Sequence, residues 1–592
     1  MRSVGVQDEF TIQKKKFRFI RLMTYFKPFI LLLLASVILA VLVNAAVLAR
    51  PYIIKLVIDD YIVEGNYDLH NIWLLGLLYF LMLLLGSGLG YLQTNILTYV
   101  GQKIMFNIRN RIFEHIQRMS MAFFDKNSTG RILTRVTNDV EALNELFSGV
   151  MVDLIRNFIM LVGIITMMLA LDVKLAFVSI SCVPIIAGVM TVYRIVARKN
   201  FIRMKGLLAK INGFLAENIS GMKLVQIFNR EKEKYEELRK LDGEFSKCSL
   251  REVVLNSFSR PVVDIINNLT IAVLIVFCMG RILEGTLEIG VLFAFIAYIK
   301  QFFEPISEIS EKYTSIQSAI ISSERIFEIL DKTDTQEDFS IGKSVGRFKG
   351  EIEFENVWFA YEGEDWVLKD VSFRINPGET AAFVGATGSG KSTIISLMAR
   401  FYDIQKGRIL IDGQDIREYG LEDLRRQIAV VLQDVFLFAG DIKSNIRLNN
   451  KNIPDEEIEY AARYVSADGF IESLPEKYNE EVKERGCTFS AGQKQLISFA
   501  RAVAFNPAIL VLDEATANID TGTEKAIQEA MSKISRGRTS VIIAHRLSTI
   551  RNADTIMVMH KGKLRETGNH AYLMELGGIY CRLYKTQLEK LI

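Results

Sequence analysis

The chain has 592 residues, of which 50% are hydrophobic and 23% are charged, and its formal net charge is +3. This length allows several domains, and the mean hydropathy of +0.21 is high for a protein whose whole surface meets water. The apolar content excludes intrinsic disorder, and the near-neutral charge gives no electrostatic basis for binding nucleic acid. The five cysteines lie far apart without metal-ligand spacing, so they predict isolated thiols.

The first half of the chain contains six apolar runs that we expect to cross a membrane. They cover 28–49, 71–102, 157–171, 175–193, 265–280 and 289–299. A bilayer core about 30 Å thick requires roughly 20 residues of helix, so the last two runs are short enough to be buried core helices instead. An even number of spans returns the chain to its starting side, which favours six spans.

The charges beside these runs predict the orientation. Basic residues cluster before the first run and after the second and fourth runs, whereas the loop after the first run is acidic. By the positive-inside rule the N-terminus, the long loops and the second half of the chain are cytoplasmic, in a multi-pass protein of the cytoplasmic membrane. The first run is too long for a signal peptide, and Phe17–Phe26 before it resembles an amphipathic helix at the membrane interface.

Two polar stretches, 103–144 and 194–254, have helical periodicity and connect the expected spans. We expect them to be helices that continue past the bilayer, with breaks near Asn127–Gly130 and Asn218–Gly221. They are either solvated hairpins or arms whose tips contact another domain.

The composition changes after residue 325. The expected organisation is a helical transmembrane domain over 1–325, a linker over 326–350, and an α/β domain over 351–592 in which short β-type runs alternate with helical ones. The motifs described next make this last domain the expected nucleotide-binding domain.

A glycine-rich loop follows the apolar strand expected at 380–384 and precedes a helix, which is the context of a phosphate-binding loop. Its backbone N–H groups and the helix N-terminus favour phosphate, Lys391 can bridge the β- and γ-phosphates of ATP, and the Ser392 hydroxyl can bind Mg²⁺. A glycine-rich turn without a ligand is the alternative. The residues expected to bind nucleotide here are Gly385, Thr387, Gly388, Ser389, Gly390, Lys391, Ser392 and Thr393.

A second apolar strand, expected at 509–514, ends in two carboxylates. Asp513 is placed to hold Mg²⁺ through water, and Glu514 can act as the general base that activates the attacking water. Such a pair alone usually caps a helix, and the phosphate loop upstream favours the catalytic interpretation.

Further motifs then carry a resemblance to a family. Phe489-Ser490-Ala491-Gly492-Gln493 resembles the LSGGQ signature of ATP-binding cassette (ABC) proteins, and the segment 481–486 is similar to one that precedes it in exporters. The resemblance implies that Tyr361 stacks on adenine, Gln433 is the Q-loop residue near Mg²⁺, and His545 is the catalytic switch histidine. It also implies nucleotide contacts from Ser490, Gly492, Gln493 and the D-loop residue Asp520.

The resemblance extends to the membrane half. Phe123-Phe124-Asp125, with Gly130, Arg135 and Asp139, resembles the first intracellular loop of ABC exporters, and 217–221 with 228–231 resembles the second. In that family the loop tips are coupling helices that dock on the nucleotide domains. The whole chain therefore resembles an ABC exporter half-transporter of the type IV fold, with a six-helix transmembrane domain followed by an α/β ATPase domain.

The resemblance implies ATP-driven export of hydrophobic or amphipathic compounds by a dimer, because each ATP is held between one chain's phosphate loop and the partner's signature. Phe489 and Ala491 replace the family's leucine and glycine, so we expect a different half-transporter as partner, as in heterodimeric bacterial multidrug exporters. A homodimeric lipid or peptide exporter is the alternative. The substrate pocket stays unassigned, since the pairs Asp153/Arg156 and Arg260/Asp264 are each expected to neutralise themselves on one helix.

Overall fold

A computed structural model describes residues 21–22, 24–65, 68–181, 183–333, 346–513, 521–543 and 550–589. The chain forms two compact units, one of residues 1–117 and 130–332 and the other of residues 118–129 and 333–592. Most of the interface helix expected at Phe17–Phe26 lies outside the described residues.

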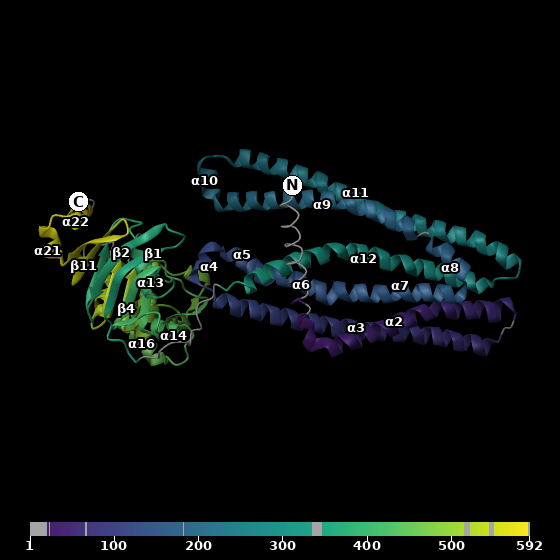
Figure 1. Ribbon diagram of the computed structural model, residues 1–592, viewed down its shortest axis with the longest axis horizontal. Helices are drawn as coiled ribbons and strands as arrows, with labels where there is room; N and C mark the ends of the chain where they lie inside the picture. Colours follow the sequence, from purple (N-terminus) through teal and green to yellow (C-terminus); the bar gives the residue numbers. More distant parts are fainter. Residues whose placement is uncertain are drawn as a thin grey trace. The chain divides into compact units, whose positions relative to one another are not determined.

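The first unit consists of long helices joined by short turns, as Figure 1 shows. The described elements are η1 (Thr24–Phe29), α2 (Ile30–Val57), η2 (Ile58–Val63), α3 (Leu69–Gln117), α5 (Thr129–Thr134), η3 (Arg135–Asp139), α6 (Val140–Glu145), η4 (Leu146–Val150), α7 (Met151–Leu171), α8 (Val173–Ile180), α9 (Val183–Ser220), α10 (Met222–Ile227), α11 (Glu231–Leu283) and α12 (Ile289–Leu330). Helix α3 has 49 residues and α11 has 53. At 1.5 Å per residue each exceeds about 70 Å, more than twice a bilayer core, so the prediction that these helices continue past the membrane is confirmed.

Among the described residues, five helical segments are long and apolar enough to span a membrane: Thr24–Val63, Leu69–Gln117, Thr129–Leu171, Asp264–Leu283 and Ile289–Ile306. The run expected at 175–193 is not among them; it contains Cys182, which lies outside the described residues, between α8, which ends at Ile180, and α9, which is described from Val183.

The tight turn between α7 and α8 is built on Asp172. Its backbone is extended, with φ −158°, and its Oδ1 accepts a hydrogen bond from the Leu175 N–H at 2.9 Å, which caps α8. Its Oδ2 accepts from Arg281 of α11 at 2.8 Å. One carboxylate thus caps a helix and joins α11 to the turn.

The charges beside the third span differ from the expectation. Arg156 lies 3.5 Å from Asp153 on α7, but it also lies 3.3 Å from Glu308 of α12, and Lys312 of α12 lies 3.0 Å from Asp153. The predicted pair on one helix is therefore present, but it is part of a larger charge network between α7 and α12. The matching expectation for Arg260 falls on a side chain outside the described set.

The second unit contains two main sheets and the helices around them. The strands are β1 (Ile352–Ala360), β2 (Trp366–Ile375), β3 (Thr380–Val384), β4 (Lys406–Ile411), β5 (Gln414–Asp415), β6 (Ile428–Val431), β7 (Gly440–Asp441), β8 (Glu481–Val482), β9 (Ile509–Asp513), β10 (Thr539–Ile543), β11 (Thr555–His560) and β12 (Lys563–Gly568). The helices are α4 (Met121–Lys126), α13 (Lys391–Met398), α14 (Leu421–Gln427), α15 (Ile442–Arg447), α16 (Asp455–Tyr464), α17 (Asp468–Glu472), η5 (Lys477–Asn479), η6 (Glu484–Gly486), α18 (Ala491–Ala504), α19 (Thr521–Ser535), α21 (His570–Glu575) and α22 (Ile579–Glu589).

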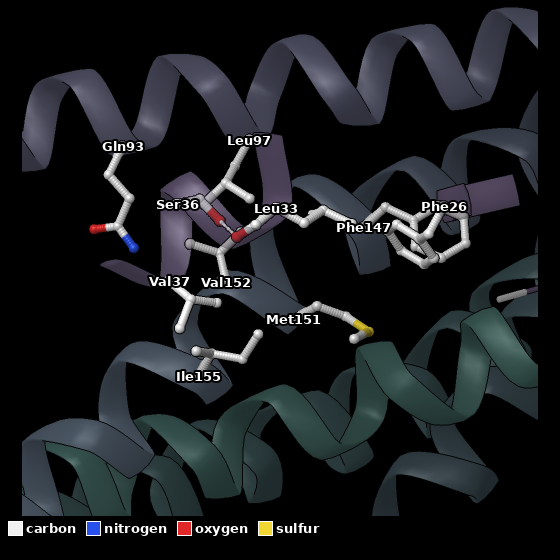
Figure 2. A pocket seen from close by; sticks show the side chains of 10 residues that line it. All are labelled: Phe26, Leu33, Ser36, Val37, Gln93, Leu97, Phe147, Met151, Val152 and Ile155. Carbon is white, nitrogen blue, oxygen red and sulfur yellow. Dashed lines mark hydrogen bonds between the residues drawn. The ribbon is translucent and has the colours of Figure 1, made fainter. Parts of the chain in front are cut away.

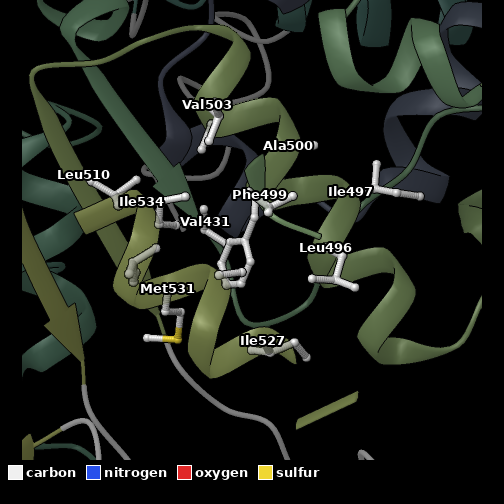
Figure 3. Packing of buried hydrophobic residues seen from close by; sticks show 14 of the residues in the cluster. Val431, Leu496, Ile497, Phe499, Ala500, Val503, Leu510, Ile527, Met531 and Ile534 are labelled. Carbon is white, nitrogen blue, oxygen red and sulfur yellow. The ribbon is translucent and has the colours of Figure 1, made fainter. Parts of the chain in front are cut away.

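The six-stranded sheet has the order β12-β11-β3-β10-β9-β6, and all neighbours but β12 and β11 are parallel. The four-stranded sheet, β2-β1-β4-β5, is antiparallel. A buried apolar cluster covers one face of the larger sheet, and Figure 3 shows Phe499 of α18 beside Ile527 of α19 and Val431 of β6 within it. The expected α/β domain is therefore confirmed.

The junction between the two halves begins later than expected. Helix α12 continues to Leu330, so the first residues of the linker expected from 326 are helical. Residues 334–345 lie outside the described part of the chain.

Candidate functional site

The candidate site lies at the edge of the six-stranded sheet where four parallel strands end. Ile543 of β10 pairs with Phe383 of β3 on one side and with Asp513 of β9 on the other. The next strand, β6, ends at Val431, two residues before Gln433. Because parallel strands end at a common edge, the glycine-rich loop after β3, Asp513 and Gln433 come together there.

Glycine is required in the loop by both conformation and space. Gly385 has φ +153° and Gly390 has φ +99°. A Cβ at Gly385 would lie 2.2 Å from the carbonyl oxygen of Met559, and one at Gly390 would lie 2.6 Å from Leu368. Gly388 has φ +78° and open space around it, so glycine is favoured there by the backbone conformation and not by a lack of room. The loop therefore holds its shape only with these residues.

Lys391 is buried at the start of α13, with 6% of its surface exposed. Its Nζ donates hydrogen bonds to the carbonyl oxygens of Gly385 at 2.8 Å and Ala386 at 3.1 Å. Burial lowers the pKa of Lys391, and the charge of Asp513 partly opposes that shift. The ammonium group thus lies inside the loop, where, among the described residues, the two carbonyl oxygens and the Asp513 carboxylate favour its charge.

The remaining loop hydroxyls divide into buried and exposed ones. Thr387 and Ser392 are exposed, whereas Ser389 and Thr393 are buried. Among the described residues, the buried Ser389 Oγ has no hydrogen-bond partner. An unpaired buried hydroxyl beside an ammonium group and a helix N-terminus fits an anionic oxygen such as that of a phosphate.

The residues expected to hold Mg²⁺ supply oxygen donors of the type that this ion prefers. Ser392 offers a hydroxyl, Asp513 a half-buried carboxylate and Gln433 an exposed amide. Among the described residues, no cluster of three or more His, Cys, Asp or Glu side chains could hold a metal alone. This donor set suits Mg²⁺ bound jointly with phosphate oxygens rather than in an all-protein cage.

Tyr361 lies beside this loop. It follows β1, is 46% exposed, and its hydroxyl lies 3.2 Å from the Thr393 Oγ1. Its ring makes edge contacts with Phe359 at 4.8 Å and Tyr402 at 5.1 Å between centroids. The ring is thereby fixed with one face open beside the phosphate loop, where an aromatic base can stack.

Helix α4, from the first expected intracellular loop, belongs to the same unit as this site. The Tyr402 hydroxyl donates a hydrogen bond to the Asp125 carboxylate of α4, and Lys126 lies 3.1 Å from Glu362, the residue after Tyr361. Burial and the Asp125 carboxylate both raise the pKa of Tyr402, so its hydroxyl stays protonated. The loop tip therefore contacts the two residues that flank and support Tyr361.

Tyr402 and Glu362 were not predicted from the sequence. The only signal is that Tyr402 is an aromatic residue shortly after α13 and Glu362 a carboxylate beside Tyr361. Neither pattern differs from ordinary surface positions.

The signature segment caps α18. The Ser490 Oγ accepts from the Gln493 N–H at 3.2 Å, and the Gln493 Oε1 accepts from the Ser490 N–H at 2.9 Å, which is a capping box. Gly492 is buried and Ala491 is exposed. Phe489 is 8% exposed and packs in the apolar cluster under the sheet, so its bulk fills the core rather than the site.

Three residues expected at the site, Glu514, Asp520 and His545, lie outside the described part of the chain. The strands that lead to Glu514 and His545 are β9 and β10, whose ends lie at the site edge.

The fold and this edge together define a P-loop ATPase domain attached to a helical membrane domain. Comparison with known proteins agrees. The family model described as the ABC transporter transmembrane region matches residues 33–306, and the one described as ABC transporter matches residues 368–517.

Relatives and a solved structure cover most of the chain. The Bacillus subtilis protein named "Probable multidrug resistance ABC transporter ATP-binding/permease protein YheH" is 43% identical over 84% of this chain and 74% of its own length. The ATP-dependent lipid A-core flippase of Syntrophus aciditrophicus is 32% identical over 97% of this chain and 95% of its own. The structure of a bacterial Atm1-family ABC exporter with ATP bound has a TM-score of 0.78 at 26% identity, covering 94% of this chain and 98% of that one.

The chain belongs to the ABC transporter family and is an exporter of that family. It is an ATP hydrolase coupled to transport across a membrane, which it crosses several times, with its ATPase domain on the cytoplasmic side.

Proposed function

We propose that this chain is one half of a dimeric exporter that moves hydrophobic or amphipathic compounds across the cytoplasmic membrane, using ATP and Mg²⁺. The observation that carries the proposal is the contact of α4 with the residues around Tyr361, because it joins the membrane arms to the place where adenine would stack. The proposed substrate class agrees with the names of the relatives, which include a multidrug transporter and a lipid flippase.

In this proposal the loop residues bind the nucleotide. Lys391 exchanges its two backbone carbonyl contacts for β- and γ-phosphate oxygens, and the Ser389 hydroxyl gains the partner that it lacks among the described residues. Ser392, Asp513 and Gln433 would hold Mg²⁺, which neutralises charge on the phosphates when bound. Glu514 accepts the proton of the attacking water, and His545 contacts the γ-phosphate.

A second chain is part of the proposal, and α10 supports it. This short helix leaves Met222, Leu224 and Ile227 exposed, by 41%, 62% and 62%, and Phe228 after it is 68% exposed. Apolar side chains gathered on a cytoplasmic loop tip favour contact with another protein surface. We propose the nucleotide domain of the partner half-transporter as that surface.

We further propose that the partner is a different half-transporter. The support is the exposed methyl group of Ala491 at the N-terminus of α18, where the family's glycine would leave room for a phosphate. Ala491 is not among the described residues with positive φ, so the conformational freedom of glycine is not needed here. The proposal therefore depends only on the space that the alanine methyl group takes up. Phe489 gives no support to a different partner, because its side chain packs in the core and not at the nucleotide site.

The chain reconstituted in proteoliposomes together with its partner half-transporter tests the function. We expect ATP-dependent accumulation of a hydrophobic dye, lost in the Lys391→Ala variant while dye partitioning into the vesicles stays the same. Dye movement that is equal with and without ATP would contradict the export proposal.

Expression of the chain alone tests the pairing. A partner with a complete signature should raise the ATPase rate at least tenfold over the single chain. A stable homodimer whose ATPase is stimulated strongly by transported dye would overturn the heterodimer proposal and leave export intact.

A further inference from the structure

The membrane unit contains a cavity of about 240 Å³ between α2, α3 and α7. Figure 2 shows Gln93 and Leu97 extending from α3 toward Val37, Val152 and Ile155. The ten lining residues are Phe26, Leu33, Ser36, Val37, Gln93, Leu97, Phe147, Met151, Val152 and Ile155. Because Phe26 and Leu33 lie at the cytoplasmic start of the first span, the cavity is in the inner half of the bilayer.

The lining contains no charged side chain and only two polar ones. The Ser36 hydroxyl donates a hydrogen bond to the carbonyl oxygen of Leu33 at 2.7 Å, so it is not available as a donor to a ligand. Gln93 is only 5% exposed, and Figure 2 draws no hydrogen bond between its amide and the other lining residues. An amide in an apolar region is costly unless it is hydrogen-bonded, so Gln93 is the lining group best suited to pair with a polar group of a ligand.

The cavity has one closed and one open end. Phe26 and Phe147 meet edge-on with ring centroids 4.8 Å apart at one end. Val37 and Ile155, which also line the cavity, are 36% and 39% exposed. A molecule can therefore enter past Val37 and Ile155 and stop at the aromatic pair.

Size and chemistry define the occupant. Cavities for whole drug-sized ligands are about 300–1,000 Å³, so this one accommodates an alkyl chain or a single ring. An apolar chain gains little by leaving lipid for an equally apolar cavity, so retention depends on the Gln93 amide. A charged head group would have no counter-charge in the lining.

We propose that this cavity is a binding subsite for an uncharged amphipathic molecule, whose hydroxyl or carbonyl group hydrogen-bonds to Gln93 while its alkyl part packs against Leu33, Leu97 and Val152. The inference deepens the proposed export function, because it names a place in the inner leaflet where such a compound is held. A membrane lipid and an exported compound share this chemistry.

Photolabelling tests the subsite in the full-length protein, in nanodiscs and without nucleotide. The probe is decan-1-ol carrying a diazirine, with the corresponding decane as the probe that lacks a polar group. Mass spectrometry should find the alcohol on peptides that contain Leu97 or Val152. Gln93→Leu, which keeps the volume, should lower this labelling about five- to tenfold, as expected for one lost hydrogen bond.

Two further variants make the test specific. Val152→Phe fills the cavity and should lower labelling similarly, whereas Leu92→Phe alters the neighbouring side chain on α3, which is 49% exposed, and should change nothing. If the Val152→Phe variant does not fold, the labelling of the Gln93→Leu variant still tests the subsite. Labelling unchanged by Gln93→Leu, or equally strong with the decane probe, would overturn the subsite.

Competition distinguishes the two sources of ligand. Displacement of the probe by a transported dye assigns the subsite to exported compounds, and displacement by added diacylglycerol alone assigns it to a membrane lipid; both support the subsite. Displacement by neither overturns the proposed class of occupant. Because labelling uses no ATP, its failure alongside intact ATP-driven dye transport would refute the subsite and not the exporter.

Discussion

The hydrogen bond from Tyr402 to Asp125 gives the sharpest test of how the membrane arms are joined to the ATP site. Tyr402→Phe removes one hydroxyl and leaves the ring contact with Tyr361 in place. A hydrogen bond to a charged group contributes about 1.5–3 kcal/mol, and water competes for the exposed Asp125, so we expect about 1 kcal/mol. A loss of that size lowers the equilibrium constant for the docking of α4 about fivefold.

Proteoliposomes that report ATP hydrolysis and dye transport together measure this change. We expect Tyr402→Phe to lower the number of dye molecules moved per ATP several-fold, with nucleotide affinity within about twofold of the parent. Asp125→Asn should act alike, and the double variant should add little to either, because both remove the same bond.

Lys126→Gln is the matched control on the same helix. Its pairing with Glu362 is between side chains that are 61% and 75% exposed, so it should contribute almost nothing. A transport ratio unchanged by Tyr402→Phe, or lowered as much by Lys126→Gln, would refute the reasoning.

Other predictions concern the site and the membrane unit. Glu514→Gln should keep ATP binding and lower turnover by on the order of 10²-fold, measured by phosphate release; near-normal turnover would remove Glu514 from its role. Lys391→Ala should instead abolish most nucleotide binding, seen by equilibrium binding of a fluorescent ATP analogue. Gly385→Ala should destabilise the ATPase domain, since its Cβ would lie 2.2 Å from a backbone oxygen, and a Tm equal to the parent would contradict this. Asp172→Ala should lower the melting temperature in detergent, because a helix cap of about 1 kcal/mol and an ion pair are lost together; Asp172→Asn, which can still cap, should lose less.

Much of the ATPase domain could be predicted from its sequence because its signals are local. The strands 380–384 and 509–514 were expected from apolar runs bounded by a glycine and by carboxylates. Strand β3 has the expected limits, and β9 ends one residue earlier, at Asp513. Glycines with positive φ in the loop after β3 were likewise expected from residue type alone. The expected apolar runs 157–171 and 175–193 leave three residues between them, and the structure forms a tight turn there at Asp172.

What could not be predicted depends on packing between distant segments. Asp125 and Tyr402 are 277 residues apart, and no periodicity relates them. The pairing of Lys312 with Asp153 similarly required knowing which faces of α7 and α12 meet, whereas the sequence offered a nearer partner in Arg156. Phe489 was counted with Ala491 as a departure from the family's signature, but its side chain lies in the core.

The membership of α4 in the ATPase unit also has a consequence for how the protein is made. Residues 118–129 leave the ribosome about 200 residues before the rest of that unit, from which they are separated by residues 130–332. At about 5–20 residues per second, the 277 residues from Asp125 to Tyr402 take roughly 14–55 s, so the segment waits at least that long before its partner surface exists. During that time Phe123, which is 3% exposed in the finished protein, is in water or covered by a chaperone. Biogenesis therefore includes a late step in which an early loop is captured by a newly folded domain, and slow folding of that domain prolongs the interval in which the loop is open to proteases.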